Sequence, residues 1–350
     1  MTLDDPALYE RGDPHRARDV LAAFPEHCRV GAALRAEPPL AARRPALVVL
    51  AGMGGSAAGG DLLAACAAGH LEVPVLVHRG YGLPAAAGER ALVLASSYSG
   101  ETAEVLSAAE AALGRGAALV ALSSGGALDA LARARGVPRV ALPAGLMPRM
   151  ALGYLFFAAA RVLEAAGLAV ATDAELGEAL AVVEALTAEL VPGQPAEANE
   201  AKRLAWALGD RLAAVYGGPL TGPVAYRWKT DLEENAKRFA LAGALPEMNH
   251  NEVEAWRPPA ARALHAVLLR DAGEPPAVAQ RFALLEELLG PAAGGVSECW
   301  TRGRGAPARL LSLACVGQWV SYYAALARGV DPWPVPVLDG LKRRLGGVQP

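Results

Sequence analysis

Short apolar runs alternate with alanine-rich helical stretches along most of the chain, and this alternation constrains the fold more than any other feature. Such a pattern is typical of parallel sheets that carry helices on both faces. We therefore expect an α/β protein with two doubly wound domains, each a mainly parallel sheet flanked by helices. The predicted strands are 46–51, 73–78, 91–96, 119–123 and 139–142 in the first half, and 212–216, 263–270 and 296–301 in the second.

The length of 350 residues fits two domains of ordinary size. About forty residues with several prolines precede the first strand, and the prolines and glycine of 191–195 (VPGQP) interrupt a helical stretch near the middle. We predict an N-terminal arm at 1–45, a first domain at 46–190 and a second domain at 196–350. Strand, glycine turn and helix recur in both domains, which indicates an internal duplication.

Composition excludes several classes of protein. With 33 Lys+Arg against 36 Asp+Glu and no basic block interleaved with aromatic residues, a nucleic-acid partner is not expected. The four cysteines lack the spacing of a zinc site or a disulfide framework. The longest apolar run, 150–160, is shorter than the ~20 residues that cross a bilayer, so it predicts a buried helix and no membrane partner. The acidic start (MTLDD) does not resemble a signal peptide, and we expect a cytoplasmic protein.

A glycine turn at 52–56 (GMGGS) ends the first strand and opens a helix. Glycines let a ligand approach the backbone, and free N–H groups at a helix start attract an anion. The turn lacks the G-x-G-x-x-G pattern of a dinucleotide site and the lysine of a phosphate-binding P-loop. Gly54, Gly55 and Ser56 are therefore candidate phosphate ligands, and an ordinary structural turn is the alternative.

A second loop at 97–102 (SYSGET) also follows a strand and precedes a helix. The hydroxyls of Ser97, Ser99 and Thr102 can converge on one point, supported by backbone N–H groups. Such a cradle of neutral donors suits a small phosphate ester. The alternative is a serine-rich helix cap without a ligand.

These two loops resemble the phosphosugar-binding SIS (sugar isomerase) module. More narrowly, the chain resembles the bifunctional phosphoglucose/phosphomannose isomerases in three later segments, and the asparagines around His250 are the most specific element. Together the motifs run from about Gly52 to Lys342, which is nearly the whole chain beyond the arm. The three segments are 225–230 (AYRWKT), 234–237 (ENAK) and 246–252 (PEMNHNE).

The resemblance implies reversible conversion of glucose 6-phosphate, and of mannose 6-phosphate in relatives that accept both epimers, into fructose 6-phosphate. Moving a carbonyl between C1 and C2 needs one base that shuttles a proton through a cis-enediolate, and the match makes Glu234 that base. His250 and Lys342 match the residues that open the sugar ring, and a histidine is suited to this because it titrates near neutrality. Arg149 matches the arginine that stabilises the enediolate charge.

The family pattern also implies a homodimer, in which His250 enters the site of the neighbouring subunit. No metal and no cofactor are expected, since acid/base groups and one arginine suffice for the chemistry. Trp333 stands where many relatives have a small polar residue, so the resemblance supports isomerisation more firmly than acceptance of both epimers.

Three other functions fit parts of the pattern. A sugar-phosphate-sensing regulator would need a helix-turn-helix, which residues 1–46 do not provide. An amidotransferase would need an N-terminal cysteine and a glutaminase domain. A catalytically silent sugar-phosphate-binding or regulatory protein is the alternative, because it would keep the hydroxyl cradle. The presence of Glu234, His250, Lys342 and Arg149 together argues against it.

Overall fold

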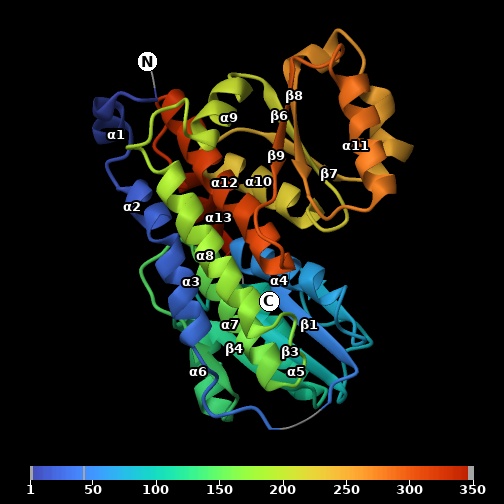
Figure 1. Ribbon diagram of the computed structural model, residues 1–350. Helices are drawn as coiled ribbons and strands as arrows, with labels where there is room; N and C mark the ends of the chain where they lie inside the picture. Colours follow the sequence, from blue (N-terminus) through green and yellow to red (C-terminus); the bar gives the residue numbers. More distant parts are fainter. Residues whose placement is uncertain (1–2, 42–43, 346–350) are drawn as a thin grey trace. The chain divides into compact units, whose positions relative to one another are not determined.

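The computed structural model describes residues 3–41 and 44–345, and the chain forms two compact units. The first unit comprises Ala23–Glu184 and Gly303–Ala308, and the second comprises Met1–Ala22, Ala185–Arg302 and Arg309–Pro350. The segment predicted as an N-terminal arm is thus shared between the two units. Figure 1 shows the elements of both units.

The first unit is built on a five-stranded parallel sheet with the strand order β2-β1-β3-β4-β5. Alternate residues point to opposite faces of a strand, and here both faces are apolar, as expected of a sheet covered on both sides. The strands are β1 (Leu47–Gly52), β2 (Val75–His78), β3 (Ala91–Ser96), β4 (Ala118–Ser123) and β5 (Arg139–Ala141). The helices are α3 (Phe24–Ala33), α4 (Gly54–Ala67), α5 (Ala103–Gly114), α6 (Gly126–Arg135), α7 (Leu152–Ala165) and the single 3-10 turn η1 (Pro148–Met150).

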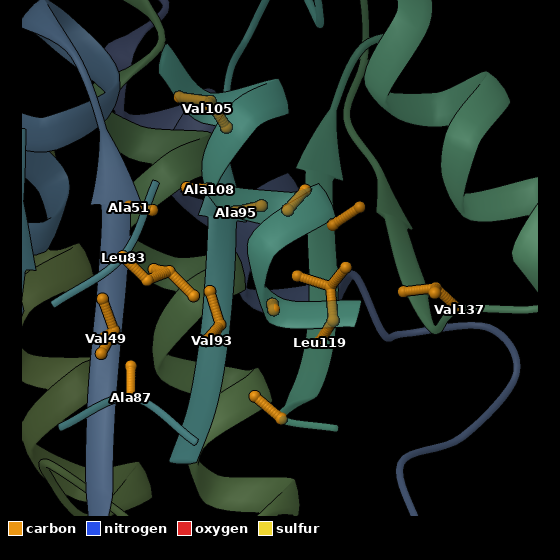
Figure 2. Close-up of a cluster of buried hydrophobic side chains, with 14 of the residues drawn as sticks. Val49, Ala51, Leu83, Ala87, Val93, Ala95, Val105, Ala108, Leu119 and Val137 are labelled. Carbon is orange, nitrogen blue, oxygen red and sulfur yellow. The ribbon is translucent and has the colours of Figure 1, made fainter. Parts of the chain in front are cut away.

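One face of this sheet packs against α5 and the loop that precedes β3 (Figure 2). Val49, Val93 and Leu119 lie in neighbouring strands of this face, and Leu83 and Ala108 cover them. The opposite face packs against α4 and α7. This sandwich fixes the strands, and therefore the loops that leave their carboxyl ends.

The second unit repeats the design with a four-stranded parallel sheet of the order β7-β6-β8-β9. Its strands are β6 (Leu212–Gly217), β7 (Ala240–Ala244), β8 (Leu264–Arg270) and β9 (Gly295–Trp300). Its helical elements are α1 (Pro6–Gly12), α2 (Ala17–Ala22), α9 (Glu200–Leu208), α10 (Gly222–Asn235), η2 (Glu247–His250), η3 (Glu252–Ala255), η4 (Ala260–Ala263), α11 (Pro276–Leu289) and α13 (Pro336–Leu345). Two long helices, α8 (Asp173–Leu190) and α12 (Ala306–Ala327), have residues in both units.

The predicted fold class is confirmed, and every predicted strand is present within two residues of its predicted ends. Strand β7 was not predicted. This edge strand reads ALAGA and carries no β-branched residue, so it lacks the usual signal of a strand. Helix α10 ends at Asn235, and Phe239, which follows it, is 86% exposed.

Most of the run at 150–160 lies in the buried helix α7, which confirms the predicted buried helix and places its start at Leu152. Among the described residues one helix, α12, is long and apolar enough to cross a membrane. Its most apolar stretch is 94% buried inside the protein, which is the environment of a core helix.

Candidate active site

The two phosphate-loop candidates meet at the carboxyl edge of the first sheet. β1 and β3 are neighbours, and the chain leaves β1 toward β2 on one side and β3 toward β4 on the other. Ligands of doubly wound sheets bind at such a switch point, outside the carboxyl ends of the strands. Gly54 and Gly55 begin α4 directly after β1, and Thr102 is the N-cap residue of α5 after β3.

Three of the predicted hydroxyl groups are brought together here. The Ser97 and Thr102 hydroxyl oxygens lie 2.8 Å apart, and the backbone N–H of Gly100 donates to Ser97 Oγ at 3.1 Å. Ser56, on α4, accepts a hydrogen bond from the backbone N–H of Tyr98 at 3.1 Å, which ties the glycine turn to the serine loop. Thr102 makes no side-chain cap bond to its own helix, and its hydroxyl pairs with that of Ser97 instead.

Ser99 lies on the exposed side of the same loop. Its hydroxyl accepts from the backbone N–H of Glu101 at 3.3 Å. The loop therefore presents Ser99 to solvent while Ser97 is buried.

Close backbone packing fixes both loops. Gly100 has a φ of +72°, and a Cβ at this position would lie 1.9 Å from the carbonyl oxygen of Gly125. A Cβ on Gly55 would lie 2.6 Å from the carbonyl oxygen of Pro148 and 2.8 Å from the Cα of Arg149. Glycine is needed at both positions because any side chain would push the backbones apart.

This packing places the segment of Arg149 directly against the start of α4. Arg149 lies in η1 and is 2% exposed. Tyr98 holds the segment that precedes η1, because its hydroxyl donates to the carbonyl of Pro143 at 2.7 Å and accepts from the N–H of Leu146 at 3.0 Å. Burial raises the pKa of Tyr98 above its ordinary value, which keeps it a neutral donor. This role of Tyr98 was not predicted from the sequence.

Glu234 is half-buried in the last turn of α10, in the second unit. Asn235 anchors this end of the helix by donating to the hydroxyl of Ser321 at 2.9 Å. The middle of the helix is fixed by a buried ion pair, in which Arg227 Nη2 lies 2.8 Å from Asp231 Oδ1. Both anchors restrict the turn that carries the carboxylate.

His250 is an exposed residue at the end of η2, in the loop that follows β7. The loop is held to the sheet by Glu252, which accepts a hydrogen bond from the buried hydroxyl of Tyr216. Trp256 Nε1 donates to the same hydroxyl at 3.1 Å. Glu252, which belongs to the Asn-His-Asn-Glu segment, therefore has a structural task that the sequence did not reveal.

Glu234 and His250 lie near opposite ends of strand β7, Glu234 at its amino end and His250 at its carboxyl end. β6 and β7 are parallel neighbours, and α10 connects the carboxyl end of β6 to the amino end of β7. The first residue of α10, Gly222, lies near the carboxyl end of β7 at Ala244. Twelve residues of helix then separate Gly222 from Glu234, which corresponds to ~18 Å at 1.5 Å per residue. His250 follows the carboxyl end of β7, whereas Glu234 precedes its amino end. The structure therefore does not bring these two residues of one chain together.

Lys342 lies on α13, whose residues are exposed or half-buried, and Lys342 itself is exposed. Among residues 3–41 and 44–345, no group of three or more His, Cys, Asp or Glu side chains is arranged to hold a metal ion. A cavity of about 770 Å³ lies at the amino edge of the first sheet, beside Leu92 and Leu119. It is at the opposite end of the strands from the hydroxyl cluster and does not belong to this site.

Comparison with known proteins agrees with this architecture. Residues 197–345 match the family model of the bacterial phospho-glucose isomerase C-terminal SIS domain. The structure titled as a glucose-6-phosphate isomerase like protein from Thermus thermophilus matches with a TM-score of 0.63, covering 97% of this chain and 99% of that chain. At 24% sequence identity this likeness concerns the fold alone.

Relatives with higher identity cover most of the sequence. A bifunctional phosphoglucose/phosphomannose isomerase from Caldicellulosiruptor bescii is 36% identical over 305 residues, which is 86% of this chain and 90% of the relative. A protein of the same name from Aquifex aeolicus is 32% identical over 306 residues, which is 85% of this chain and 90% of the relative. The chain therefore belongs to the bifunctional phosphoglucose/phosphomannose isomerase family and is an isomerase.

Proposed function

We propose that the protein interconverts glucose 6-phosphate and mannose 6-phosphate with fructose 6-phosphate by ring opening and proton transfer through a cis-enediolate. The observation that carries this proposal is the cluster of Ser56, Ser97 and Thr102 hydroxyls at the switch point of the first sheet. A cluster of neutral donors at a helix start is suited to a phosphate monoester that has to leave after each turnover. The relatives named above act on such sugars according to their names.

Each remaining candidate has a role in this reaction. Glu234 takes the proton from one carbon and returns it to the next, and His250 and Lys342 transfer the protons that open the ring. Arg149 stabilises the negative charge that develops on the enediolate oxygens. Gly54, Gly55 and Ser99 offer further backbone and hydroxyl donors to the phosphate. The proposed mechanism uses no cofactor and no metal.

We further propose that the active enzyme is a homodimer in which His250 serves the site of its partner. The support for this is the distance between the carboxyl and amino edges of the second sheet, which separates His250 from Glu234 within one chain. A histidine delivered by a second copy meets the need for an acid/base group beside Glu234. Closed two-fold dimers supply such an arrangement twice.

The proposed setting is the cytoplasm, with free hexose 6-phosphates as the partners and no nucleic acid or membrane. The test is a coupled assay of the purified protein with fructose 6-phosphate, in which glucose 6-phosphate and mannose 6-phosphate are read separately. We expect turnover by the wild type and a loss of at least 10³-fold for Glu234→Gln, because the amide cannot accept the proton. Binding of the sugar phosphate without turnover would identify a silent binding protein and overturn the proposal.

A further inference from the structure

Lys237 has a backbone conformation that lysine rarely adopts. Its φ is +52°, and it follows Ala236, the C-cap residue of α10. This position after a helix is normally filled by glycine, because a Cβ is unfavourable in the left-handed region. Among the described residues only Arg16 is another non-glycine residue with a positive φ. Strained residues of this kind persist where the surrounding contacts hold them in place.

The side chain of Lys237 supplies those contacts. Its ammonium donates to the backbone carbonyls of Glu234 at 2.9 Å and Asn235 at 3.2 Å. It also donates to the carbonyls of Asp331 at 3.0 Å and Pro332 at 3.2 Å. A cation is favourable at a helix C-terminus, where the last carbonyls have no helical partner. Lys237 thus joins the turn that carries Glu234 to a segment almost one hundred residues later.

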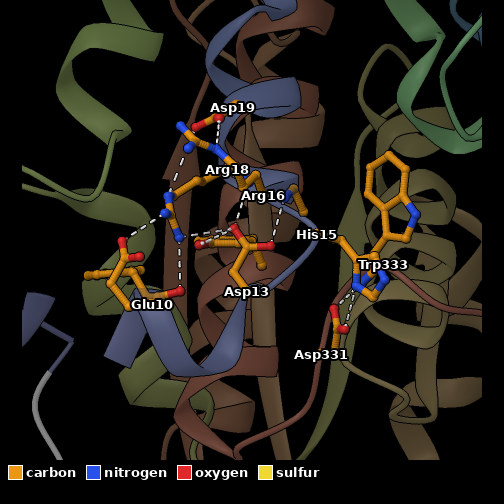
Figure 3. A network of polar contacts seen from close by, with 11 residues as sticks. Glu10, Asp13, His15, Arg16, Arg18, Asp19, Asp331 and Trp333 are labelled. Atoms are coloured by element: carbon orange, nitrogen blue, oxygen red, sulfur yellow. Dashed lines mark hydrogen bonds and ion pairs between the residues drawn. The ribbon is translucent and has the colours of Figure 1, made fainter. Parts of the chain in front are cut away.

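That segment is also held by His15, which comes from the N-terminal part of the chain (Figure 3). His15 Nδ1 lies 2.8 Å from Asp331 Oδ2, and the His15 ring is stacked on Trp333 with 6.4 Å between the ring centres. The other carboxylate oxygen of Asp331 accepts from the backbone N–H of Trp333 at 2.9 Å. Two side chains, Lys237 and His15, therefore hold the loop of Asp331.

His15 itself projects from a rigid support. The carboxylate of Asp13 is buried and accepts from the backbone N–H groups of Ala17 at 2.7 Å and Arg18 at 3.0 Å. The hydroxyl of Tyr322, on α12, donates to it at 3.0 Å. These bonds connect residues 13–18 to α12 in the core of the second unit. From there a series of contacts leads through His15, Asp331 and Lys237 to Glu234.

We propose that Lys237, supported by His15 through Asp331, is a positioning residue that holds the Glu234 carboxylate in the geometry for proton transfer. The inference rests on the proposed function, since it takes Glu234 as the base. Proton transfer requires the base to lie within hydrogen-bond reach of the carbon-bound proton, and a displacement of about 1 Å can cost up to ~10²-fold in rate. A glycine would adopt this φ with less strain, so in this chain the ammonium contacts offset the strain of the lysine.

The decisive variant is Lys237→Gly, which relieves the strained φ and removes the ammonium. We expect an unfolding midpoint equal to or above that of the wild type, a KM for fructose 6-phosphate within about threefold, and a kcat lower by about tenfold or more. Lys237→Arg, which keeps a cation, should recover part of kcat. A merely structural cap would behave in the opposite way, because its removal would lower stability and leave kcat intact.

The matched control is Arg16→Gly, which relieves the other positive φ without touching the contacts of Asp331. It should leave kcat unchanged. His15→Ala should lower kcat severalfold, and its effect should be much smaller when Lys237 is already glycine, because both act through Asp331.

The outcomes separate this inference from the proposed function. Wild-type turnover that Glu234→Gln abolishes supports the function. If Lys237→Gly then retains full kcat, or loses stability and kcat together, the positioning role is wrong while the isomerase proposal stands. A wild type without turnover would overturn both.

Discussion

Replacing Gly100 by alanine tests whether the serine loop is held by backbone packing. The new Cβ would lie 1.9 Å from the carbonyl oxygen of Gly125 and 3.1 Å from the Cα of Gly126, and the φ of +72° would be strained as well. The strained φ costs about 1–2 kcal/mol, and forcing two packed backbones apart costs about 1–3 kcal/mol. We therefore expect a loss of about 2–5 kcal/mol in the free energy of unfolding of the first unit.

Gly136→Ala is the matched control in the same unit. Gly136 has a φ of +62° and no atom within 4 Å of a built Cβ, so it should show only the strain of about 1–2 kcal/mol. Urea unfolding should be followed by circular dichroism, because all six tryptophans lie in the second unit. Fructose 6-phosphate should also bind Gly100→Ala at least tenfold more weakly, since the loop carrying Ser97 and Thr102 has to move. Equal stability and equal affinity of the two variants would refute the reasoning.

Three further predictions concern single contacts. Burial and the nearby Arg211 lower the pKa of His265 from 6.5 to about 4, so the contribution of neutral His265 to stability is complete above pH 6.5 and is lost as the pH falls toward 4. Urea unfolding followed by tryptophan fluorescence should show a loss of about 3 kcal/mol in the free energy of unfolding over this range, and His265→Gln should abolish that loss. An unchanged pH profile in the variant would contradict the assignment. Arg227→Met removes the partner of the buried Asp231 carboxylate in this ion pair and should lower the free energy of unfolding by about 3–5 kcal/mol in the same assay. Much of the loss should be recovered when Asp231 is also replaced by leucine, and full stability of the single variant would show that the pair is unimportant. Thr102→Val should weaken fructose 6-phosphate binding about 10–100-fold by calorimetry in the Glu234→Gln background, and unchanged affinity would exclude this hydroxyl from the phosphate site.

The fold could be predicted because its signal is local. Parallel strands buried on both faces appear as short apolar runs, and the glycine and serine loops mark where those strands end. The one missed strand, β7, contains only alanine, leucine and glycine and is paired on a single side, so neither composition nor periodicity distinguishes it from a loop.

The candidate site could be predicted only in part, because several of its contacts join residues far apart in the sequence. Ser56, Ser97 and Thr102 come from two loops whose strands are neighbours, and the strand order explains their meeting. Tyr98, Glu252 and Lys237 act through partners that no local pattern indicates. Glu234 and His250 are only 16 residues apart in the sequence, and this spacing does not indicate that a whole strand, β7, separates them.

Mixing two inactive variants tests the central claim that Glu234 and His250 of different copies form one site. Glu234→Gln and His250→Ala should each be inactive alone. In a dimer that contains one chain of each kind, one site combines the intact Glu234 of one chain with the intact His250 of the other, while the second site lacks both. Random exchange makes half of the dimers mixed, so about one quarter of wild-type turnover should return after unfolding and refolding the two variants together. If both residues served a site within one chain, the refolded mixture would remain inactive.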